Sequence, residues 1–301
     1  MCDIIIGCSL KDCIKELPQF RRSIENLIQN CEKSIELFVY ENNSEDGTKE
    51  FLSSWQRDSH FVHIKCETLM EIDLASIARD FKNNRCQNEL LSQARNKLLD
   101  FIESSKSYSS SQYILMLNIN DGNILPIEQL AVTLENPPID FDALIAYGYD
   151  AEGRVADIVS YRTFEFPFGP EVIGQEYFEP AYKKTIASTF EKNMNLIPLV
   201  SCNGGIFIFK KEAIFKRRYS CLPTAFLHTY YKKRCDEIIN PCQYTFNNSA
   251  IGMYYFDDSV FYFNTHDCNY PIVSMHCNML VEMRLSGYDK IFMYTKLRWP
   301  M

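Results

Sequence analysis

The first 147 residues alternate short apolar runs with amphipathic stretches, and this alternation constrains the fold more than any other feature of the sequence. Apolar runs predict strands at residues 4–8, 35–40, 60–65, 113–117 and 141–147. The stretches between them predict helices at residues 17–31, 49–58, 90–103 and 126–135. Repeated β–α units of this kind pack as a mostly parallel sheet with helices on both faces. We therefore expect an α/β fold.

The second half of the chain has no comparable period. Residues 148–200 and 217–270 are rich in tyrosine and phenylalanine, and we expect them to be largely irregular. Between these stretches, residues 205–209 predict a strand and residues 212–216 a helical turn. Near the end, we expect a final inner strand at 272–275 and a helix from about 278 to 285. This half is expected to lie over the edge of the sheet.

Composition narrows the class of protein. The 301 residues are 46% hydrophobic, which suffices for a large core, in one big domain or in two halves that share a cleft. A net charge of −8 argues against a general nucleic-acid binder, which needs a basic face. No apolar stretch is long enough to span a bilayer, and the N-terminus is too short and acidic for a signal peptide. We therefore expect the 12 cysteines to be reduced and mostly buried.

The most specific local segment follows the second predicted strand. Residues 41–48 read Glu-Asn-Asn-Ser-Glu-Asp-Gly-Thr, a tight turn in which Gly47 permits a positive φ. Ligands of open α/β sheets bind at the carboxyl ends of the strands. Glu41 and Asn42 are therefore candidates to hydrogen-bond a base or a ribose. The alternative is an ordinary turn that only caps the next helix.

Four segments, taken together, carry a family resemblance. They are residues 7–13, residues 40–48, Ala94-Arg95-Asn96 with the strand tip at 118–121, and residues 201–205. In their order and spacing the chain resembles GT-A-fold, nucleotide-sugar-dependent glycosyltransferases. It is similar to the fungal capsule-associated mannosyltransferase-like enzymes and to related enzymes of large DNA viruses. The resemblance spans roughly residues 3–210, with a weaker echo to about 294.

The resemblance implies one GT-A-like (Rossmann-like) domain over residues 1–301. Residues 1–122 would form the nucleotide-sugar-binding half and residues 123–301 the acceptor-binding half. It also implies a set of donor-binding residues: Cys8, Ser9, Leu10, Glu41, Asn42, Asp46, Arg95, Asn118, Asn120, Asn203 and Gly204. An arginine suits a diphosphate through its fork of donors, and the alternative for Arg95 is a helix-surface ion pair. Two glycines after Asn203 would let the backbone approach a sugar closely.

The resemblance further implies a divalent metal, Mn²⁺ or Mg²⁺, at a D-x-D motif on a strand tip. Here that tip reads Asn118-Ile119-Asn120-Asp121, with asparagine at two positions where aspartate is expected. An amide oxygen can ligate a hard cation but adds no charge. The implied ligands are Asn120, Asp121 and His276, in a weakened site, whereas Met275 stands where a carboxylate is expected. The alternatives are metal-independent or lost activity, and a structural role for His276.

The acceptor side is less specific. An inverting transferase needs a carboxylate as general base for the acceptor hydroxyl, whereas a retaining one can lack it. The candidates are Asp258, Asp257 and Asp157, with Glu237 in addition, and each is alternatively a solvated surface acid. Residues 155–162, which end in Arg162, resemble a Tyr-Asp…Arg stretch of the family.

These expectations combine into one function. The chain would move a sugar from a nucleotide diphosphate donor, a UDP- or GDP-sugar, to a glycan acceptor. It would act in the cytoplasm, including that of an infected host cell, without nucleic acid or a membrane span. The rival is a degenerate transferase-like protein that only binds nucleotide or glycan, an alternative motivated by Asn118, Asn120 and Met275. A nucleotidyltransferase is less favoured, because no glycine-rich phosphate loop follows the first strand.

Overall fold

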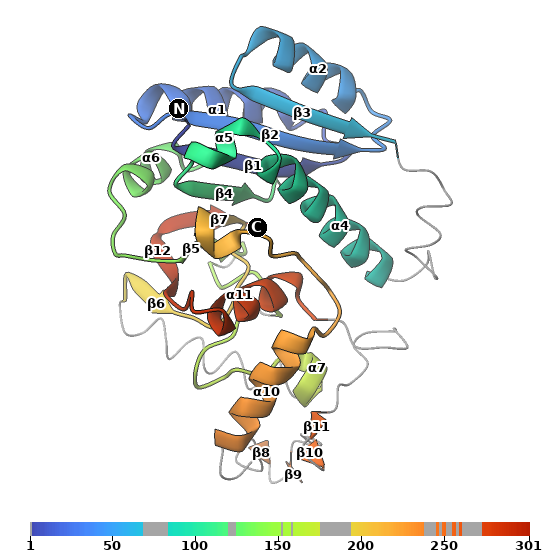
Figure 1. Ribbon diagram of the computed structural model, residues 1–301, viewed down its shortest axis with the longest axis vertical. Coiled ribbons are helices and arrows are strands. Elements are labelled where there is room, and N and C mark those ends of the chain that lie inside the picture. The colour runs from blue at the N-terminus through green and yellow to red at the C-terminus, as the bar shows by residue number, and fades with distance from the viewer. Residues whose placement is uncertain are drawn as a thin grey trace.

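The computed structural model describes residues 2–68, 84–119, 125–151, 153–157, 159–174, 194–237 and 273–301, and the backbone of four short strands between 245 and 260. Its centre is an eight-stranded sheet (Figure 1). In spatial order the strands are β3 (Val62–Glu67), β2 (Ile35–Asn42), β1 (Ile4–Leu10), β4 (Tyr113–Leu117), β7 (Ile206–Lys210), β5 (Ala143–Tyr149), β12 (Ile291–Pro300) and β6 (Leu196–Pro198). Neighbouring strands are parallel except around β7 and β6, so the sheet is mostly parallel, as expected.

Helices flank this sheet, which completes the predicted GT-A-like α/β architecture. They are α1 (Leu17–Asn30), α2 (Thr48–Asp58), α4 (Asn84–Glu103), α5 (Lys106–Ser110), α6 (Ile127–Glu135), α7 (Pro170–Ile173), α9 (Lys211–Ile214), α10 (Ala225–Glu237) and α11 (Met275–Leu285). Two small antiparallel sheets pair β8 (Thr245–Phe246) with β9 (Ser249–Ala250), and β10 (Tyr255–Phe256) with β11 (Ser259–Val260). Among the described helices, none is long and apolar enough to cross a membrane.

Both faces of the sheet are buried, which explains why its strands read as continuous apolar runs. Alternate side chains enter two separate cores: Ile5 and Ile114 lie in one, Ile6 and Leu115 in the other. Helices α1, α2 and α6 supply the side chains that pack on the second core. Helices α4, α10 and α11 supply those of the first. Figure 1 shows α1 and α2 at one end of the molecule and α10 at the other.

The register brings the strand ends to one edge of the sheet. Leu10 lies opposite Glu41, and Cys8 lies opposite Leu117, so β1, β2 and β4 end together. Strand β7 is antiparallel to β4, and its first residues therefore lie at the same edge. There the Asn118 N–H donates to the Gly205 carbonyl over 2.8 Å. This edge collects most of the described residues singled out in the sequence.

The turn after β2 is locked to the loop after β1. The side chains of Ser44, Thr48 and Asp46 accept the backbone N–H groups of residues 12, 13 and 14, at 2.9, 3.0 and 2.9 Å. In return the Asp12 carboxylate accepts the Glu45 N–H at 2.9 Å. Gly47 has φ 98°, which confirms the predicted strand, tight turn and helix. The polar residues of this segment therefore hold two loops together.

Two expectations about the second half were wrong. Residues 225–237, expected to be irregular, form α10, whose buried side chains include Leu227, Tyr231 and Cys235 at four-residue spacing. Tyrosine is a weak helix former, which obscured that helical pattern. Within the expected strand at 272–275, the described residues 273 and 274 lead into α11, which begins at Met275. A four-residue apolar run does not distinguish a strand from a buried helix start.

The cysteine prediction is confirmed for the described part of the chain. Nine cysteines whose side chains the structure describes are free, and seven of these nine are buried. Burial raises the pKa of several of these thiols, including Cys8 and Cys202, which keeps them protonated at neutral pH.

Gly204 gives a test of the packing between β7 and β5. A methyl group on Gly204 would overlap the backbone carbonyl oxygen of Ala146, whereas one on Gly153 would meet open space. We expect Gly204→Ala to lower the free energy of unfolding by about 3 kcal/mol. Gly153→Ala should cost only about 1 kcal/mol, for the positive φ. Urea unfolding of both variants checks this, and equal losses would contradict the packing argument.

Candidate functional site

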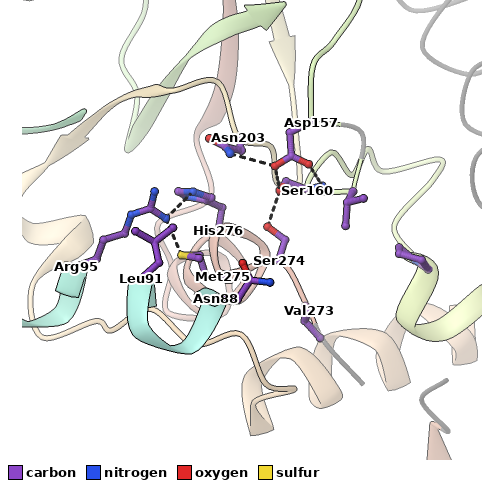
Figure 2. A pocket seen from close by; sticks show the side chains of 12 residues that line it. Asn88, Leu91, Arg95, Asp157, Ser160, Asn203, Val273, Ser274, Met275 and His276 are labelled. Carbon is purple, nitrogen blue, oxygen red and sulfur yellow. Dashed lines mark hydrogen bonds between the residues drawn. The ribbon is translucent and has the colours of Figure 1, made fainter. Parts of the chain in front are cut away.

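A cavity of about 260 Å³ opens between α4, the segment after β5, the start of β7 and the start of α11 (Figure 2). It is lined by Asn88, Leu91, Arg95, Asp157, Val159, Ser160, Pro170, Asn203, Val273, Ser274, Met275 and His276. Figure 2 shows Arg95 facing His276, with Asn203, Asp157 and Ser160 on another side. Three residues predicted from separate segments, Arg95, Asn203 and Asp157, thus line one cavity.

Arg95 is the only arginine or lysine of this lining, and its side chain is 7% exposed. One guanidinium nitrogen donates to Asn118 Oδ1 over 2.5 Å, and the other faces His276 Nε2 over 3.1 Å and the Met275 sulfur. The guanidinium also lies 5.4 Å from the ring centre of Tyr219. All of these partners are neutral. Among the described residues, no carboxylate lies within 4.0 Å of Arg95, so it is not the helix-surface ion pair considered as the alternative.

His276 is held as a neutral hydrogen-bond acceptor. Its ring stacks on Phe207, with centroids 4.4 Å apart and 9° between the planes, and meets the edge of Tyr219. Because arginine only donates, Nε2 must accept, which puts the proton of the neutral ring on Nδ1. Burial, with the nearby Arg95 charge, lowers the pKa of His276 well below its usual 6.5.

A chain of hydrogen bonds leads from Arg95 to Asp157. Asn118 Nδ2 donates to Asn203 Oδ1 over 3.2 Å, and Asn203 Nδ2 donates to an Asp157 oxygen over 3.0 Å. Ser160 donates to Asp157 through its N–H and its hydroxyl, and that hydroxyl also meets the Ser274 hydroxyl at 2.6 Å. Asp157 is the one acidic residue in the lining. The cavity therefore carries a cation and an anion separated by two side-chain amides.

The predicted metal ligands do not all fit. Asn120 and Asp121 lie outside the described residues. His276 offers its Nε2 lone pair to Arg95, and a metal bound there would have to displace that guanidinium. Within the described ranges, no three or more His, Cys, Asp or Glu side chains gather as a metal site would require. In the described structure Nε2 of His276 is occupied by Arg95, and a role of His276 as a metal ligand stays a prediction.

At the tips of β1 and β2 the predicted donor residues divide into two groups. Glu41 is fully buried: one carboxylate oxygen accepts the Ser44 N–H at 2.7 Å, and the carboxylate also lies beside the Cys66 thiol, whose pKa is raised to about 11 by burial and by Glu41. Ser9 and Asn42 are half-buried at the same edge. By contrast, the side chains of Cys8 and Leu10 pack in the core, so only their backbone can reach a ligand.

Other candidates have structural tasks or lie elsewhere. The Asp46 carboxylate accepts the N–H groups of Ile14 and Thr48, and these bonds lower its pKa. At Gly204 a side chain would overlap the Ala146 carbonyl oxygen, so packing alone accounts for a glycine there, and a contact of its backbone with a ligand stays a prediction. Glu237 ends α10, where it pairs with Arg234, and it does not line the cavity. Asp257 and Asp258 lie outside the described residues.

Two further residues of the family-like segments are structural. Arg162 is fully buried and pairs with the buried Glu171, which also accepts a bond from Tyr231. The side chain of Asn96 accepts the N–H of Tyr219 at 2.7 Å and donates to its carbonyl at 3.0 Å. These bonds fix the backbone of Tyr219, whose ring packs on Arg95.

Sequence reasoning did not single out Ser160, Ser274, Tyr219 or Phe207. Ser274 could have been recognised as the residue before a helix, because serine is favoured at that position. The expectation of a strand at 272–275 prevented this. No sequence pattern distinguishes Phe207 or Tyr219 from ordinary core residues.

The lowered pKa of His276 predicts a pH dependence of stability. The folded protein resists protonation of this ring, whereas the unfolded chain accepts a proton near pH 6.5. His276 therefore does not reduce the free energy of unfolding above about pH 6.5. Below that pH, the free energy of unfolding decreases by up to about 1.4 kcal/mol for each pH unit. We expect His276→Gln to flatten this slope in urea unfolding from about pH 7.5 to 5. The exposed His60→Gln is the control, and an unchanged slope in His276→Gln would refute the assignment.

Comparison with solved structures finds a general likeness at low identity. A mannosyltransferase, PcManGT from Pyrobaculum calidifontis, solved with GDP-Man and Mn²⁺, matches with a TM-score of 0.37 and 11% identity, over 72% of this chain and 47% of that one. S. aureus TarS 1-349 matches with a TM-score of 0.37 and 12% identity, over 74% and 52%. Glucosyl-3-phosphoglycerate synthase from Mycobacterium tuberculosis, solved with Mn²⁺ and UDP, gives 0.36 and 11%, over 70% and 58%. The chain thus spans about half the length of these proteins.

A search of curated proteins finds no match. The comparison with protein families is decisive, because one family model matches residues 3–247, most of the chain. The match includes β1, the turn after β2, Arg95, the tip after β4 and the Asn203 segment. The chain therefore belongs to the family described as Cryptococcal mannosyltransferase 1.

Proposed function

We propose that the protein is a glycosyltransferase that moves a sugar from a nucleotide diphosphate-sugar to a glycan acceptor. In this reaction the bond between the sugar C1 and the β-phosphate oxygen breaks, and its electrons leave with the nucleoside diphosphate. A new bond forms between C1 and an acceptor hydroxyl oxygen, whose proton passes to a base. The departing diphosphate needs positive charge beside it. Family membership supports the reaction class. The donor that we propose is a UDP- or GDP-sugar.

The observation that carries the proposal is the buried guanidinium of Arg95 in the wall of the cavity. A buried charge without a counter-charge is costly, and proteins retain one where a ligand supplies the opposite charge. Arg95 has only neutral partners among the described residues. A diphosphate supplies two negative charges and oxygens that suit the planar fork of arginine.

The remaining donor contacts follow from the same edge of the sheet. Glu41, at the tip of β2, stays a prediction for a contact with the base or ribose, because its carboxylate is fully buried. Ser9 and Asn42, beside it, are further candidates, as are backbone groups of Cys8 and Leu10. Asn203, Ser160 and Ser274 would contact sugar hydroxyls, because all three line the cavity and carry donors and acceptors.

Asp157 is our candidate for the base that receives the acceptor proton, if the enzyme inverts the anomeric centre. It is the acidic residue of the cavity lining, and hydrogen bonds from Ser160 and Asn203 fix its orientation. Asp257 and Asp258 stay predictions. So do a metal held by Asn120 and Asp121, the division at residue 122, and the cytoplasmic and virus-encoded setting.

Donor hydrolysis separates an enzyme from a degenerate binding protein. We expect slow release of UDP or GDP from one member of a panel of UDP- and GDP-sugars, tested with Mn²⁺, with Mg²⁺ and with chelator. Binding of a nucleoside diphosphate without any turnover, with or without glycan acceptors, would support the degenerate alternative.

Arg95→Met should weaken the binding of UDP or GDP by about 1.5–3 kcal/mol, the usual contribution of a charge-assisted hydrogen bond. Folding stability should be unchanged or higher, because a buried charge is removed. Calorimetric titration measures the affinity. The control is Arg21→Met, which removes a half-exposed arginine from a pair on α1. Equal affinities for Arg95→Met and the parent protein would refute the phosphate contact.

Asp157→Asn should lower kcat by about 100-fold or more, since it removes a general base but keeps the side-chain shape. Affinity for UDP or GDP should not fall, because the change removes a negative charge near Arg95. Steady-state kinetics and calorimetry test the two parts separately, with the surface variant Asp58→Asn as control. A normal kcat would exclude Asp157 as the base.

A further inference from the structure

Arg95 lies between two side chains that metal sites commonly use. Its guanidinium donates to the amide oxygen of Asn118 at 2.5 Å and to the imidazole Nε2 of His276 at 3.1 Å. Oxygen and imidazole nitrogen atoms of this kind are ordinary ligands of divalent metals. Here both accept hydrogen bonds from one cationic side chain, so a positive charge already stands between them.

Among the described residues, no carboxylate pairs directly with the Arg95 guanidinium. Asn118 and Met275 are neutral at positions where the family resemblance leads one to expect carboxylates, and His276 is a neutral acceptor. A carboxylate at position 118 or 275 would form an ion pair with the guanidinium. Asp157 is connected to it only through Asn118 and Asn203. Neutral side chains at positions 118 and 275 would weaken a metal site. The same neutral side chains leave the positive charge of Arg95 free to attract an anion.

Arg95 also retains hydrogen-bonding capacity. Arginine has five N–H donors, and three are directed at Asn118, His276 and Met275. Two donors make no hydrogen bond to the described residues: the Nε–H, and one N–H of the terminal nitrogen that binds Asn118. These two donors remain for the oxygens of a phosphate.

We propose that the guanidinium of Arg95 supplies the fixed positive charge for the diphosphate, so that nucleoside diphosphate binds without a divalent metal. This inference rests on the proposed function. It makes His276 and Asn118 positioning residues for Arg95 instead of metal and donor ligands. Their neutrality is then a requirement of the site.

Asn118→Asp distinguishes this mechanism from a weakened metal site, because the two predict changes of opposite sign. A carboxylate at this position would pair with Arg95 and weaken GDP and UDP binding in EDTA by about tenfold or more. In a metal site the same change would add charge and tighten binding in Mn²⁺. Asn26→Asp, on the exposed side of α1, is the control for net charge.

The experiment is calorimetric titration of GDP and UDP into the parent protein and both variants, in EDTA and in Mn²⁺. We expect the parent affinity for the better nucleotide to agree within about threefold in the two conditions, and Asn118→Asp to bind more weakly in EDTA. If Asn118→Asp does not fold, Met275→Glu brings a carboxylate to the same guanidinium and should have the same effect. If the parent protein binds only with Mn²⁺, or if the carboxylate introduced at position 118 or 275 causes no loss of affinity in EDTA, the inference is overturned but the proposed function still stands. No binding of GDP or UDP in either condition would overturn the proposed function itself.

Discussion

The contacts of one buried guanidinium join segments that are far apart in the sequence. Arg95 extends from α4 to Asn118 after β4, to Tyr219 before α10, and to Met275 and His276 at the start of α11. Asn96, the next residue, fixes the backbone of Tyr219. The second half of the chain is thereby attached to the first at the point where the sheet ends. The cavity exists because these segments meet around Arg95 without filling the space in front of it.

This arrangement has an electrostatic cost. Desolvation lowers the pKa of Arg95, but an arginine remains protonated at neutral pH. Hydrogen bonds to neutral acceptors recover part of the lost hydration, while an ion pair would recover more and cancel the charge. Within the described part of the chain, the protein therefore gives up stability at this position and keeps a cation with neutral partners only. Such a balance is typical of binding sites, where stability is exchanged for affinity.

Local patterns predicted the first half of the chain well, because each of its strands and helices carries its own period. The strand at 113–117 has the predicted bounds, and helix α1 differs by one residue. Arg95, Asn203 and Asp157 were selected from separate segments by family resemblance, and they line one cavity. The role of His276 was not predictable from sequence, since it depends on Arg95, 181 residues away. In the same way, α10 is determined by its packing on α11, and no local signal marks that contact.

The interlocked loops after β1 and β2 have a consequence for how a ligand would bind. The side chains of Ser44, Asp46 and Thr48 accept the backbone N–H groups of the neighbouring loop. These two loops therefore lose their conformational entropy when the chain folds. Binding a ligand would not have to order them again. Because the bonds are shared, paired substitutions in the two loops should deviate from additivity, although the residues lie more than thirty positions apart. The two loops are therefore expected to move together as one unit at this edge of the sheet.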